Sequence, residues 1–215
     1  MRTRVKICGC RGVEDAALAV DAGADAVGVI LAEGTPRQVG LAQLHAVAAA
    51  VPALVTLVAV FVDPPASLVD EALECGAIPQ FHGDEPAAAC EAFAAGPYLK
   101  AYHVRPGAEA ASAEFERFAA PYAHATWLFD TARADGRSGG SGRTFDWQIA
   151  RRLAGPRPIV VSGGLTPENA GDCVRAVRPF AVDVASGVET DGRKDPRKVR
   201  AFVAAVRAAD AEAGP

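Results

Sequence analysis

Two side chains that could perform acid–base chemistry stand at the ends of short β-prone runs. Cys8 ends the run RVKIC and is followed at once by Gly9, and Asp130 ends the run TWLFD. A thiolate can act as a base or a nucleophile, and cations such as Lys6 or Arg37 nearby would lower the pKa of Cys8. A carboxyl group at an apolar mouth has a raised pKa and can act as a general acid near neutral pH. We therefore predict that Cys8 and Asp130 form a catalytic pair.

Both residues also have simpler interpretations. A single cysteine in a strand is often a small buried hydrophobic residue, and an aspartate after a strand can cap the segment that follows. Cys10 lies two positions from Cys8, but the sequence has no second pair at matching spacing, so the pattern of a zinc site is incomplete.

Two glycine-containing turns late in the chain could bind an anion. Ser162-Gly163-Gly164 exposes backbone N–H groups, and Thr166-Pro167-Glu168 then offers a helix cap followed by proline in the first turn. Ser186-Gly187 supplies further donors one strand–helix unit later. The pairing predicts a phosphate site on Gly163, Gly164, Ser186 and Gly187. The alternative is that these glycines only permit tight turns.

Other polar residues at run ends could contact a substrate. Arg37 closes a Thr-Pro-Arg turn, where its planar guanidinium could bind a carboxylate through two hydrogen bonds, although a solvated surface arginine is the alternative. His82 and His103 end neighbouring runs and could ligate a metal together with Asp63. The two remaining histidines lie elsewhere, which leaves the ligand set incomplete. We predict no metal, and we predict that His82 is a hydrogen-bonding group in the pocket wall.

The elements that must position these residues alternate along the whole chain. Short β-branched runs are separated by Ala-rich segments of helical period, which is typical of βα units around a parallel sheet. The runs span 4–8, 26–31, 55–62, 78–82, 99–104, 126–130, 158–161 and 180–185, and the helical segments lie near 13–22, 41–50, 66–75, 86–94, 108–119, 145–153, 167–177 and 196–208.

Eight strands and eight helices predict an α/β fold, a (β/α)8 TIM barrel that forms a single domain over residues 1–215. An open doubly wound sheet is the alternative. That fold would normally place a glycine-rich fingerprint after the first strand, whereas the glycine turns here follow the last two. In a barrel the working groups stand at the carboxyl ends of the strands, so Cys8, Asp130 and the glycine turns would share one rim.

The segment at about 132–143 is rich in glycine, serine and arginine and too polar to pack. We predict a mobile loop that closes over the barrel mouth and excludes water. A disordered surface connection would have the same sequence character.

Composition limits the function classes. The formal net charge is −4, and the lysines and arginines form no block, which disfavours nucleic acid as a partner. No stretch reaches the roughly 18 apolar residues of a membrane span, and the first residues do not resemble a secretory signal. The five cysteines are odd in number and scattered, so we expect free thiols in a cytoplasmic protein that binds no membrane.

A series of motifs follows the chain in order from residue 4 to about 200. They are Lys6-Ile7-Cys8-Gly9, Glu14-Asp15-Ala16, Ala22-Gly23-Ala24-Asp25-Ala26-Val27-Gly28, Thr35-Pro36-Arg37-Gln38-Val39, Val60-Phe61-Val62, His82-Gly83-Asp84-Glu85, the stretch 139–147 (GGSGRTFDW), Ser162-Gly163-Gly164-Leu165-Thr166-Pro167-Glu168-Asn169 and Val182-Asp183-Val184-Ala185-Ser186-Gly187-Val188-Glu189. Each motif alone is weak, but together they are specific. In this order they resemble the phosphoribosylanthranilate isomerase family.

The resemblance implies an Amadori rearrangement that needs no cofactor. N-(5-phosphoribosyl)anthranilate would become 1-(2-carboxyphenylamino)-1-deoxyribulose 5-phosphate, a step of tryptophan biosynthesis. By the family pattern Asp130 protonates the furanose ring oxygen, and Cys8 then removes the C2 proton of the resulting Schiff base. The binding residues would be Arg37 for the anthranilate carboxylate, His82 in the pocket wall, Asp183 for the sugar, and Gly163, Gly164, Ser186 and Gly187 for the phosphate.

The chain departs from the family pattern in a few places. Cys10-Arg11 stands where an aliphatic residue and threonine are usual, Ile30-Leu31-Ala32 lacks a common aromatic, and Phe81 replaces a usual leucine. These changes bear on the shape of the aromatic pocket rather than on the acid and base. Two other functions stay open: a noncatalytic phosphosugar-binding barrel, and a broad-specificity isomerase that also serves histidine synthesis. We expect a monomer or a homodimer.

Overall fold

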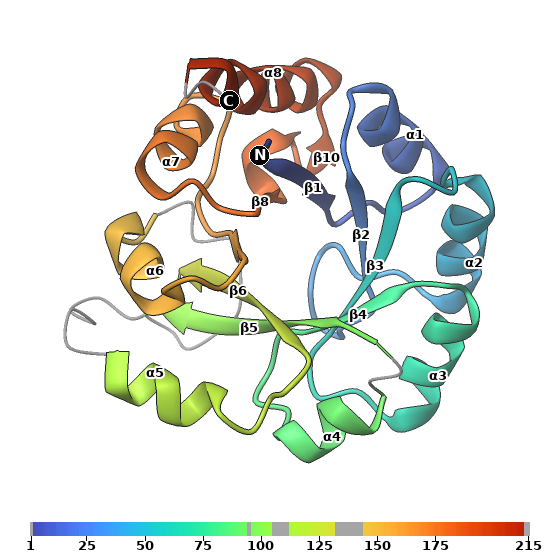
Figure 1. Cartoon of the computed structure of the whole chain (residues 1–215). Coiled ribbons are helices and arrows are strands. Elements are labelled where there is room, and N and C mark those ends of the chain that lie inside the picture. The colour runs from blue at the N-terminus through green and yellow to red at the C-terminus, as the bar shows by residue number, and fades with distance from the viewer. Residues whose placement is uncertain (1, 94–95, 105–111, 132–143, 213–215) are drawn as a thin grey trace.

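Eight parallel strands close into a barrel with the helices packed around it (Figure 1). The computed structural model describes residues 2–93, 96–104, 112–131 and 144–212. Neighbouring strands pair in chain order, and β1 closes the ring against β8 with Arg4 opposite Ala181 and Lys6 opposite Asp183. The predicted TIM barrel is therefore confirmed, and the open-sheet alternative is wrong.

The observed strands match the predicted runs to within one residue at each end. They are β1 (Arg4–Cys8), β2 (Ala26–Ile30), β3 (Thr56–Phe61), β4 (Ile78–Phe81), β5 (Tyr98–Val104), β6 (Ala125–Thr131), β7 (Ile159–Val161) and β8 (Ala181–Val184). The helices are α1 (Val13–Asp21), α2 (Leu41–Ala50), α3 (Ala66–Glu74), α4 (Ala87–Ala92), α5 (Ser112–Ala119), α6 (Trp147–Ala154), α7 (Ala170–Val177) and α8 (Pro196–Glu212). The predicted mobile loop at 132–143 lies outside the described residues.

The start of α7 corrects one prediction. The sequence placed Thr166 as a cap with the helix from 167, but α7 begins at Ala170. The Asn169 side chain causes the shift, because its Oδ1 accepts from the Thr166 N–H at 2.8 Å and its Nδ2 donates to the Gly164 carbonyl at 3.0 Å. The extra turn ties the glycine loop after β7 to the helix that follows.

A small hairpin after β8 was not predicted. A 3-10 turn, η2 (Ser186–Val188), leads into β9 (Glu189–Thr190), which pairs with β10 (Arg193–Lys194) in antiparallel fashion. The two residues between them, Asp191 and Gly192, both have positive φ, as a tight hairpin turn requires.

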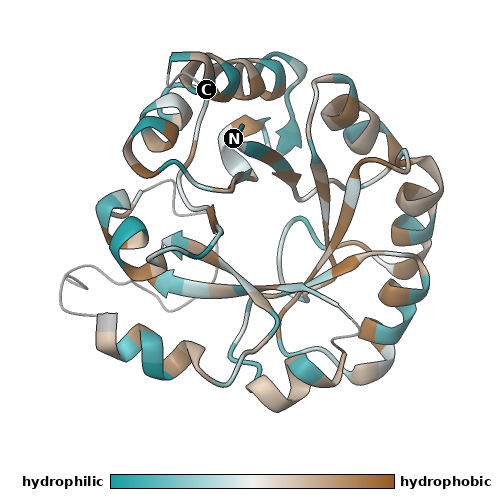
Figure 2. Ribbon diagram, viewed as in Figure 1, coloured by the Kyte–Doolittle hydropathy of each residue, from teal (hydrophilic) through white to brown (hydrophobic). Residues whose placement is uncertain are grey.

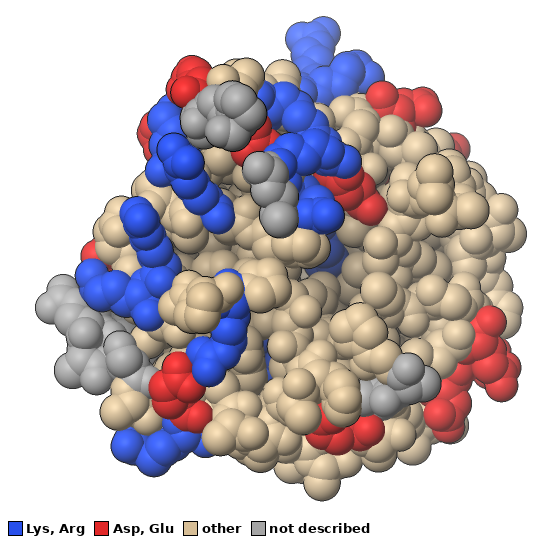
Figure 3. Space-filling view, in the orientation of Figure 1, with Lys and Arg blue, Asp and Glu red and all other residues tan. Residues whose placement is uncertain are grey.

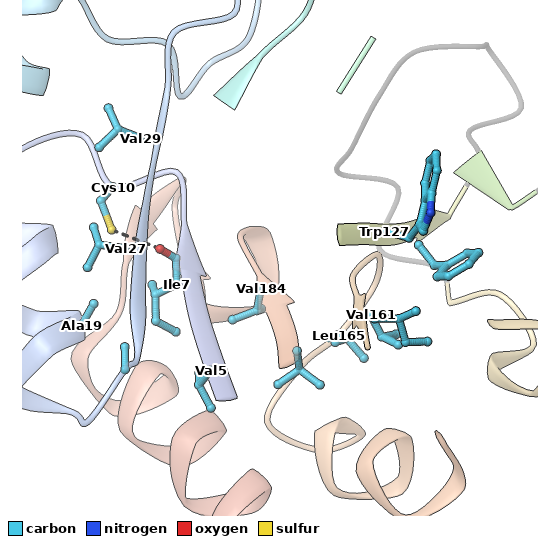
Figure 4. Close-up of a cluster of buried hydrophobic side chains, with 14 of the residues drawn as sticks. Val5, Ile7, Cys10, Ala19, Val27, Val29, Trp127, Val161, Leu165 and Val184 are labelled. Carbon is cyan, nitrogen blue, oxygen red and sulfur yellow. Dashed lines mark hydrogen bonds between the residues drawn. The ribbon is translucent and has the colours of Figure 1, made fainter. Parts of the chain in front are cut away.

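Strand residues alternate between two packing environments. Val5 and Ile7 face outward into the layer between strands and helices, together with Cys10, whose Sγ donates to the Ile7 carbonyl at 3.6 Å (Figure 4). Cys8 belongs instead to a separate cluster inside the barrel with Val58 and Val60. Cys8 and Cys10 therefore lie on opposite sides of the barrel wall and cannot share a zinc ion. In Figure 2 the surrounding helices carry hydrophobic and hydrophilic residues side by side, as amphipathic helices do.

Inside the barrel the character of the inward positions changes along the strands. Ala101, Leu128, Val160 and Ala181 form an apolar cluster. Two residues further toward the carboxyl ends, the inward positions are polar. Asp130, Ser162 and Asp183 are buried there, and His103 is half-buried. The polar layer therefore lies directly on an apolar floor, at the end of the barrel where the chemistry was predicted.

Basic side chains gather over α6, α7 and α8 in the view of Figure 3. A cavity of about 550 Å³ lies on this side, lined by Arg151, Arg157 and Arg178 among others. It also includes Ile159, the first residue of β7, so it lies at the opposite end of the barrel from the predicted site. Within the described ranges, none of the helices is long and apolar enough to cross a membrane.

A buried ion pair holds the segment that follows β4. Lys100 Nζ lies 2.9 Å from Glu85 Oε2, and both side chains are almost fully buried. Lys100 also donates to the Gly83 carbonyl, and Glu85 Oε1 accepts from the N–H groups of Asp63 and Gly83. This cluster fixes the backbone immediately after His82.

We predict that Lys100→Met lowers the free energy of unfolding by about 3–5 kcal/mol, because it leaves the Glu85 carboxylate buried without its partner. Urea unfolding followed by circular dichroism measures the loss. Arg157→Met is the matched control, since it breaks the exposed Arg157–Glu116 pair, whose contribution to stability solvent screening keeps small. Equal losses in the two variants would contradict the structural role of the buried pair.

Candidate active site

The predicted acid and base lie on the same rim of the barrel. Cys8 is the last residue of β1, and Asp130 is the last but one of β6. Ser162 follows β7 directly, and Ser186 begins the turn after β8. Because the strands are parallel, these positions all stand at the carboxyl end of the barrel. The fold thus brings together residues that lie far apart in sequence.

The two glycine turns contact each other and the acid. A Cβ on Gly187 would overlap the Leu165 carbonyl oxygen, so the turn after β8 packs directly on the loop after β7. Gly163 has φ +83°, and a Cβ there would lie 2.5 Å from Asp130 Oδ1. Only glycine allows these close approaches. The backbone predicted to hold phosphate therefore lies against the predicted acid.

Asp130 is buried and accepts hydrogen bonds at both oxygens. His82 Nε2 lies 3.1 Å from Oδ2, and the Thr131 N–H donates to Oδ1 at 2.7 Å. Burial alone would raise the pKa of Asp130, but the hydrogen bond with His82, the nearby His103 and the Thr131 N–H outweigh it, so the pKa lies below its ordinary value. The predicted raised pKa is wrong, because the sequence did not show that His82 would contact this carboxylate.

Cys8 is buried at the inner wall with 5% of its surface exposed. Burial raises the pKa of its thiol, and the positive charges of Lys6 and Lys194 only partly oppose this effect. The sequence-based prediction of a favoured thiolate is therefore wrong in direction. The cations were correctly expected nearby, but the loss of water around sulfur has the larger effect.

A continuous series of hydrogen bonds runs across the barrel interior. Ser162 Oγ donates to Asp183 Oδ2 at 3.0 Å, and Lys6 Nζ lies 2.9 Å from both Asp183 Oδ1 and Gln80 Oε1. Gln80 Nε2 lies 3.0 Å from His82 Nδ1, and His82 reaches the acid through its other nitrogen. The first residue of the predicted phosphate loop is thus linked to the acid through buried side chains.

Arg37 faces a carboxylate of the protein itself. Its Nε and one Nη donate to the two oxygens of Glu189 at 2.8 and 2.7 Å. Glu189 also accepts from Lys194 Nζ at 2.8 Å. Glu189 and Lys194 both belong to the hairpin after β8. The Arg37 side chain is only 17% exposed, so the alternative of a solvated surface arginine is wrong.

The histidine cluster differs from the one considered as a metal site. His82 and His103 contact each other with ring centroids 5.1 Å apart, and His103 Nε2 donates to the His82 carbonyl at 3.1 Å. Burial, together with His82, lowers the pKa of His103. The third nearby group is Asp130 rather than the expected Asp63, whose backbone binds Glu85 instead.

Several residues of the site were not assigned from the sequence. Gln80, Glu189 and Lys194 were given no role, and Lys6 was considered only as a nearby cation. Period-2 alternation was the available signal: Lys6 must share the inward face with Cys8, and Gln80 with His82. The Asp-Gly turn signalled the hairpin that carries Glu189 and Lys194.

Comparisons with known proteins agree over nearly the whole chain. The family model for N-(5′-phosphoribosyl)anthranilate (PRA) isomerase matches residues 5–205. The N-(5′-phosphoribosyl)anthranilate isomerase of Dechloromonas aromatica (strain RCB) is 44% identical over 215 residues, covering 98% of this chain and 99% of that protein.

Two solved structures with 33% sequence identity have similar folds, each covering 96% of this chain and 99% of its own. Monomers generated from the dimeric phosphoribosylanthranilate isomerase of Thermotoga maritima superpose with a TM-score of 0.79. A phosphoribosylanthranilate isomerase in complex with reduced 1-(o-carboxyphenylamino)-1-deoxyribulose 5-phosphate gives 0.78.

Fold and rim together define a (β/α)8 barrel that carries a thiol, a buried carboxyl group and paired glycine turns at the carboxyl ends of its strands. The comparisons narrow this class to one family. The chain belongs to the PRA isomerase family and is an isomerase of tryptophan biosynthesis.

We predict that the Cys8 thiol stays protonated at neutral pH in the free enzyme. A raised pKa means less thiolate at every pH than in free cysteine, so the midpoint of its thiolate absorbance at 240 nm should lie at a higher pH than that of an ordinary cysteine. The difference between wild type and Cys8→Ser isolates this signal from the other four cysteines. A difference signal already present at pH 7 would contradict the burial argument.

Proposed function

We propose that this chain isomerises PRA to 1-(2-carboxyphenylamino)-1-deoxyribulose 5-phosphate with Asp130 as general acid and Cys8 as general base. The contact between Gly163 and Asp130 is the observation that carries the proposal. It brings the backbone suited to a phosphate directly beside a carboxyl group, on the rim where the thiol also lies. A phosphosugar anchored by its phosphate would thus have its ring near both groups.

The reaction has two proton transfers. Asp130 donates a proton to the furanose ring oxygen as the C1–O bond breaks, and the nitrogen lone pair forms a protonated Schiff base at C1. The Cys8 thiolate then removes the proton from C2, and the C2–H electron pair forms a C1–C2 double bond while the imine electrons return to nitrogen. The resulting enolamine tautomerises to the ketone.

In the free enzyme, Asp130 and Cys8 have the opposite protonation states to those that these two steps need. Asp130 has a lowered pKa and Cys8 a raised one, so the dominant free form holds a carboxylate and a thiol. The reactive form, with thiolate and protonated acid, contains the same number of protons. The ratio of the two forms therefore does not depend on pH.

The binding roles follow the available donors. Phosphate would lie on Gly163, Gly164, Ser186 and Gly187, the last two of which form part of η2. The anthranilate carboxylate would meet Arg37, whose Nη1 has no hydrogen-bond partner among the described residues.

Two further binding residues keep the roles predicted for them, and both already have protein partners. Asp183 would help hold the sugar by exchanging its bond with Ser162. His82 would contact the substrate from the pocket wall beside Asp130. Neither role requires a cofactor or a metal.

We extend the proposal to the setting of the enzyme. We infer a cytoplasmic enzyme that acts on a small molecule and binds neither nucleic acid nor membrane, in keeping with its mild net charge and scattered cysteines. A monomer and a homodimer both fit. The Thermotoga maritima protein is described as dimeric, and sedimentation velocity measures the state of this chain.

We predict that Cys8→Ser and Asp130→Asn each lower kcat by at least about 10²-fold, because each removes a proton-transfer group. Steady-state conversion of PRA, followed by loss of anthranilate-type fluorescence, measures the effect. Cys10→Ser is the matched control: it replaces a buried cysteine two residues away that faces the outer packing layer, so its kcat should stay near wild type. A near-wild-type rate for either of the first two variants would remove that residue from the mechanism.

A further inference from the structure

A row of four buried polar side chains ends at Asp130. Its hydrogen-bond donors and acceptors can be paired along the row in only one way. The row consists of Lys6, Gln80, His82 and Asp130, with 3%, 1%, 9% and 4% of their surfaces exposed. Each neighbouring pair is separated by 2.9–3.1 Å, so every link is a hydrogen bond of ordinary length.

Lys6 sets the direction of the row. An ammonium group has only donors, and Lys6 Nζ lies 2.9 Å from Gln80 Oε1. The Gln80 amide must therefore present its oxygen to Lys6 and its NH2 group to the other side. Burial opposes the charge on Lys6, but the Asp183 carboxylate at 2.9 Å outweighs it and raises the pKa of the ammonium group. Lys6 thus remains a donor throughout the working pH range.

Gln80 in turn fixes the tautomer of His82. Its Nε2 lies 3.0 Å from His82 Nδ1, and two donors cannot share one hydrogen bond, so Nδ1 carries no proton. A neutral imidazole with a bare Nδ1 has its proton on Nε2, which lies 3.1 Å from Asp130 Oδ2. His82 therefore donates to Asp130 as a neutral group.

We propose that Gln80 is a positioning residue, which keeps His82 a neutral Nε2–H donor so that Asp130 remains able to take up and deliver the catalytic proton. A second proton on His82 would stand at Nδ1 and face the Gln80 NH2 group. Rotating the Gln80 amide to accept it would turn that NH2 group against the Lys6 ammonium. In a buried site either donor–donor contact leaves two N–H groups without an acceptor, so the imidazolium form is disfavoured.

The consequence for the acid follows from electrostatics. A neutral donor lowers the pKa of Asp130 less than an imidazolium at the same distance would, because the imidazolium adds a full positive charge. A lower pKa reduces the protonated fraction of the acid, tenfold for each unit. Gln80 thereby limits how strongly His82 holds Asp130 in its ionised form. The effect of Gln80 on catalysis rests on the proposed function, whereas the tautomer of His82 does not.

The same tautomer disfavours a metal ion at this place. The ligand atoms of His82, His103 and Asp130 lie within 4.8 Å of one another, close enough to suggest a shared cation. Coordination through His82 Nε2 would move its proton to Nδ1, where it would face the Gln80 NH2 group. Metal-bound histidines normally donate from their second nitrogen to an acceptor, and Gln80 presents a donor instead.

Two-bond 1H–15N correlation spectra of the enzyme labelled at histidine test the tautomer directly. The chain has only four histidines, and loss of one set of signals in His82→Gln assigns the residue. We expect a non-protonated Nδ1 and a protonated Nε2 for His82 at neutral pH in the wild type. A protonated Nδ1 would overturn the inference, whatever the activity.

Gln80→Glu tests the catalytic role. The carboxylate can still accept from Lys6, but it also accepts from His82 Nδ1–H, so we expect His82 to become doubly protonated at neutral pH. The kcat should then fall at least about tenfold with KM within about threefold, because the acid is held ionised. A doubly protonated His82 with unchanged kcat would overturn the positioning role, and so would an unchanged tautomer.

Thr3→Val is the control for losing a part-buried hydrogen bond elsewhere. It removes the 2.8 Å bond from Thr3 Oγ1 to Asp210, which lies outside the site, so kcat and the His82 spectrum should stay as in wild type. The two proposals can fail independently. The proposed function is contradicted if Cys8→Ser or Asp130→Asn keeps its activity. The inference about Gln80 is contradicted if the His82 spectrum shows a protonated Nδ1, or if Gln80→Glu keeps its kcat while the other two variants are inactive.

Discussion

The site depends on one buried positive charge, the ammonium group of Lys6. Placing such an ion inside a protein costs several kcal/mol after relaxation, so it persists only where the surroundings compensate it. Asp183 supplies the counter-charge and Gln80 a neutral acceptor, both at 2.9 Å. This charge determines the direction of the neighbouring hydrogen bonds. It orients the Gln80 amide, the amide selects the His82 tautomer, and His82 donates to Asp130. On the other side, Asp183 holds Ser162 at the start of the glycine loop. A single ion on β1 therefore orients polar groups on β4, β6 and β8 and others directly after β4 and β7.

Close backbone approach at the rim is the second constraint. The barrel brings strand ends to one edge, but side chains on the loops would keep those ends apart. Gly163 allows the loop after β7 to touch Asp130, and Gly187 allows the turn after β8 to pack on Leu165. The hairpin that follows carries Glu189 and Lys194 back toward Arg37. The glycines therefore do more than permit turns, because they determine which loops are in contact at the rim.

Period and strand-end position predicted the barrel well, because both depend on local sequence. Alternation placed all eight strands within one residue, and strand-end position placed Cys8 and Asp130 on one rim. The ionisation of the pair could not be predicted in the same way. Asp130 meets His82 from 48 positions away, and Cys8 is desolvated by strands β2 and β3 rather than by its neighbours in sequence. The helix after the glycine loop started late for a similar reason, since the Asn169 side chain forms its bonds with backbone that only the folded loop provides. Local pattern thus specifies which groups arrive at the rim, and the assembled interior specifies their charge.

The reversed ionisation of the free pair is consistent with catalysis when the field around each group is considered. Asp130 lies against the loop that would hold the phosphate, and a dianion there would raise the pKa of the carboxyl group by like-charge repulsion. The ammonium groups of Lys6 and Lys194 favour the Cys8 thiolate already in the free enzyme, and Cys8 is not among the atoms nearest to Gly163 in that loop. Substrate would therefore act more strongly on the acid than on the base. The difference between the two pKa values would narrow when substrate binds, and the reactive protonation state would become more populated in the complex than in the free enzyme. On this argument the positive charges belong next to the thiol and the bare amides next to the carboxyl group, which is the arrangement that the barrel shows.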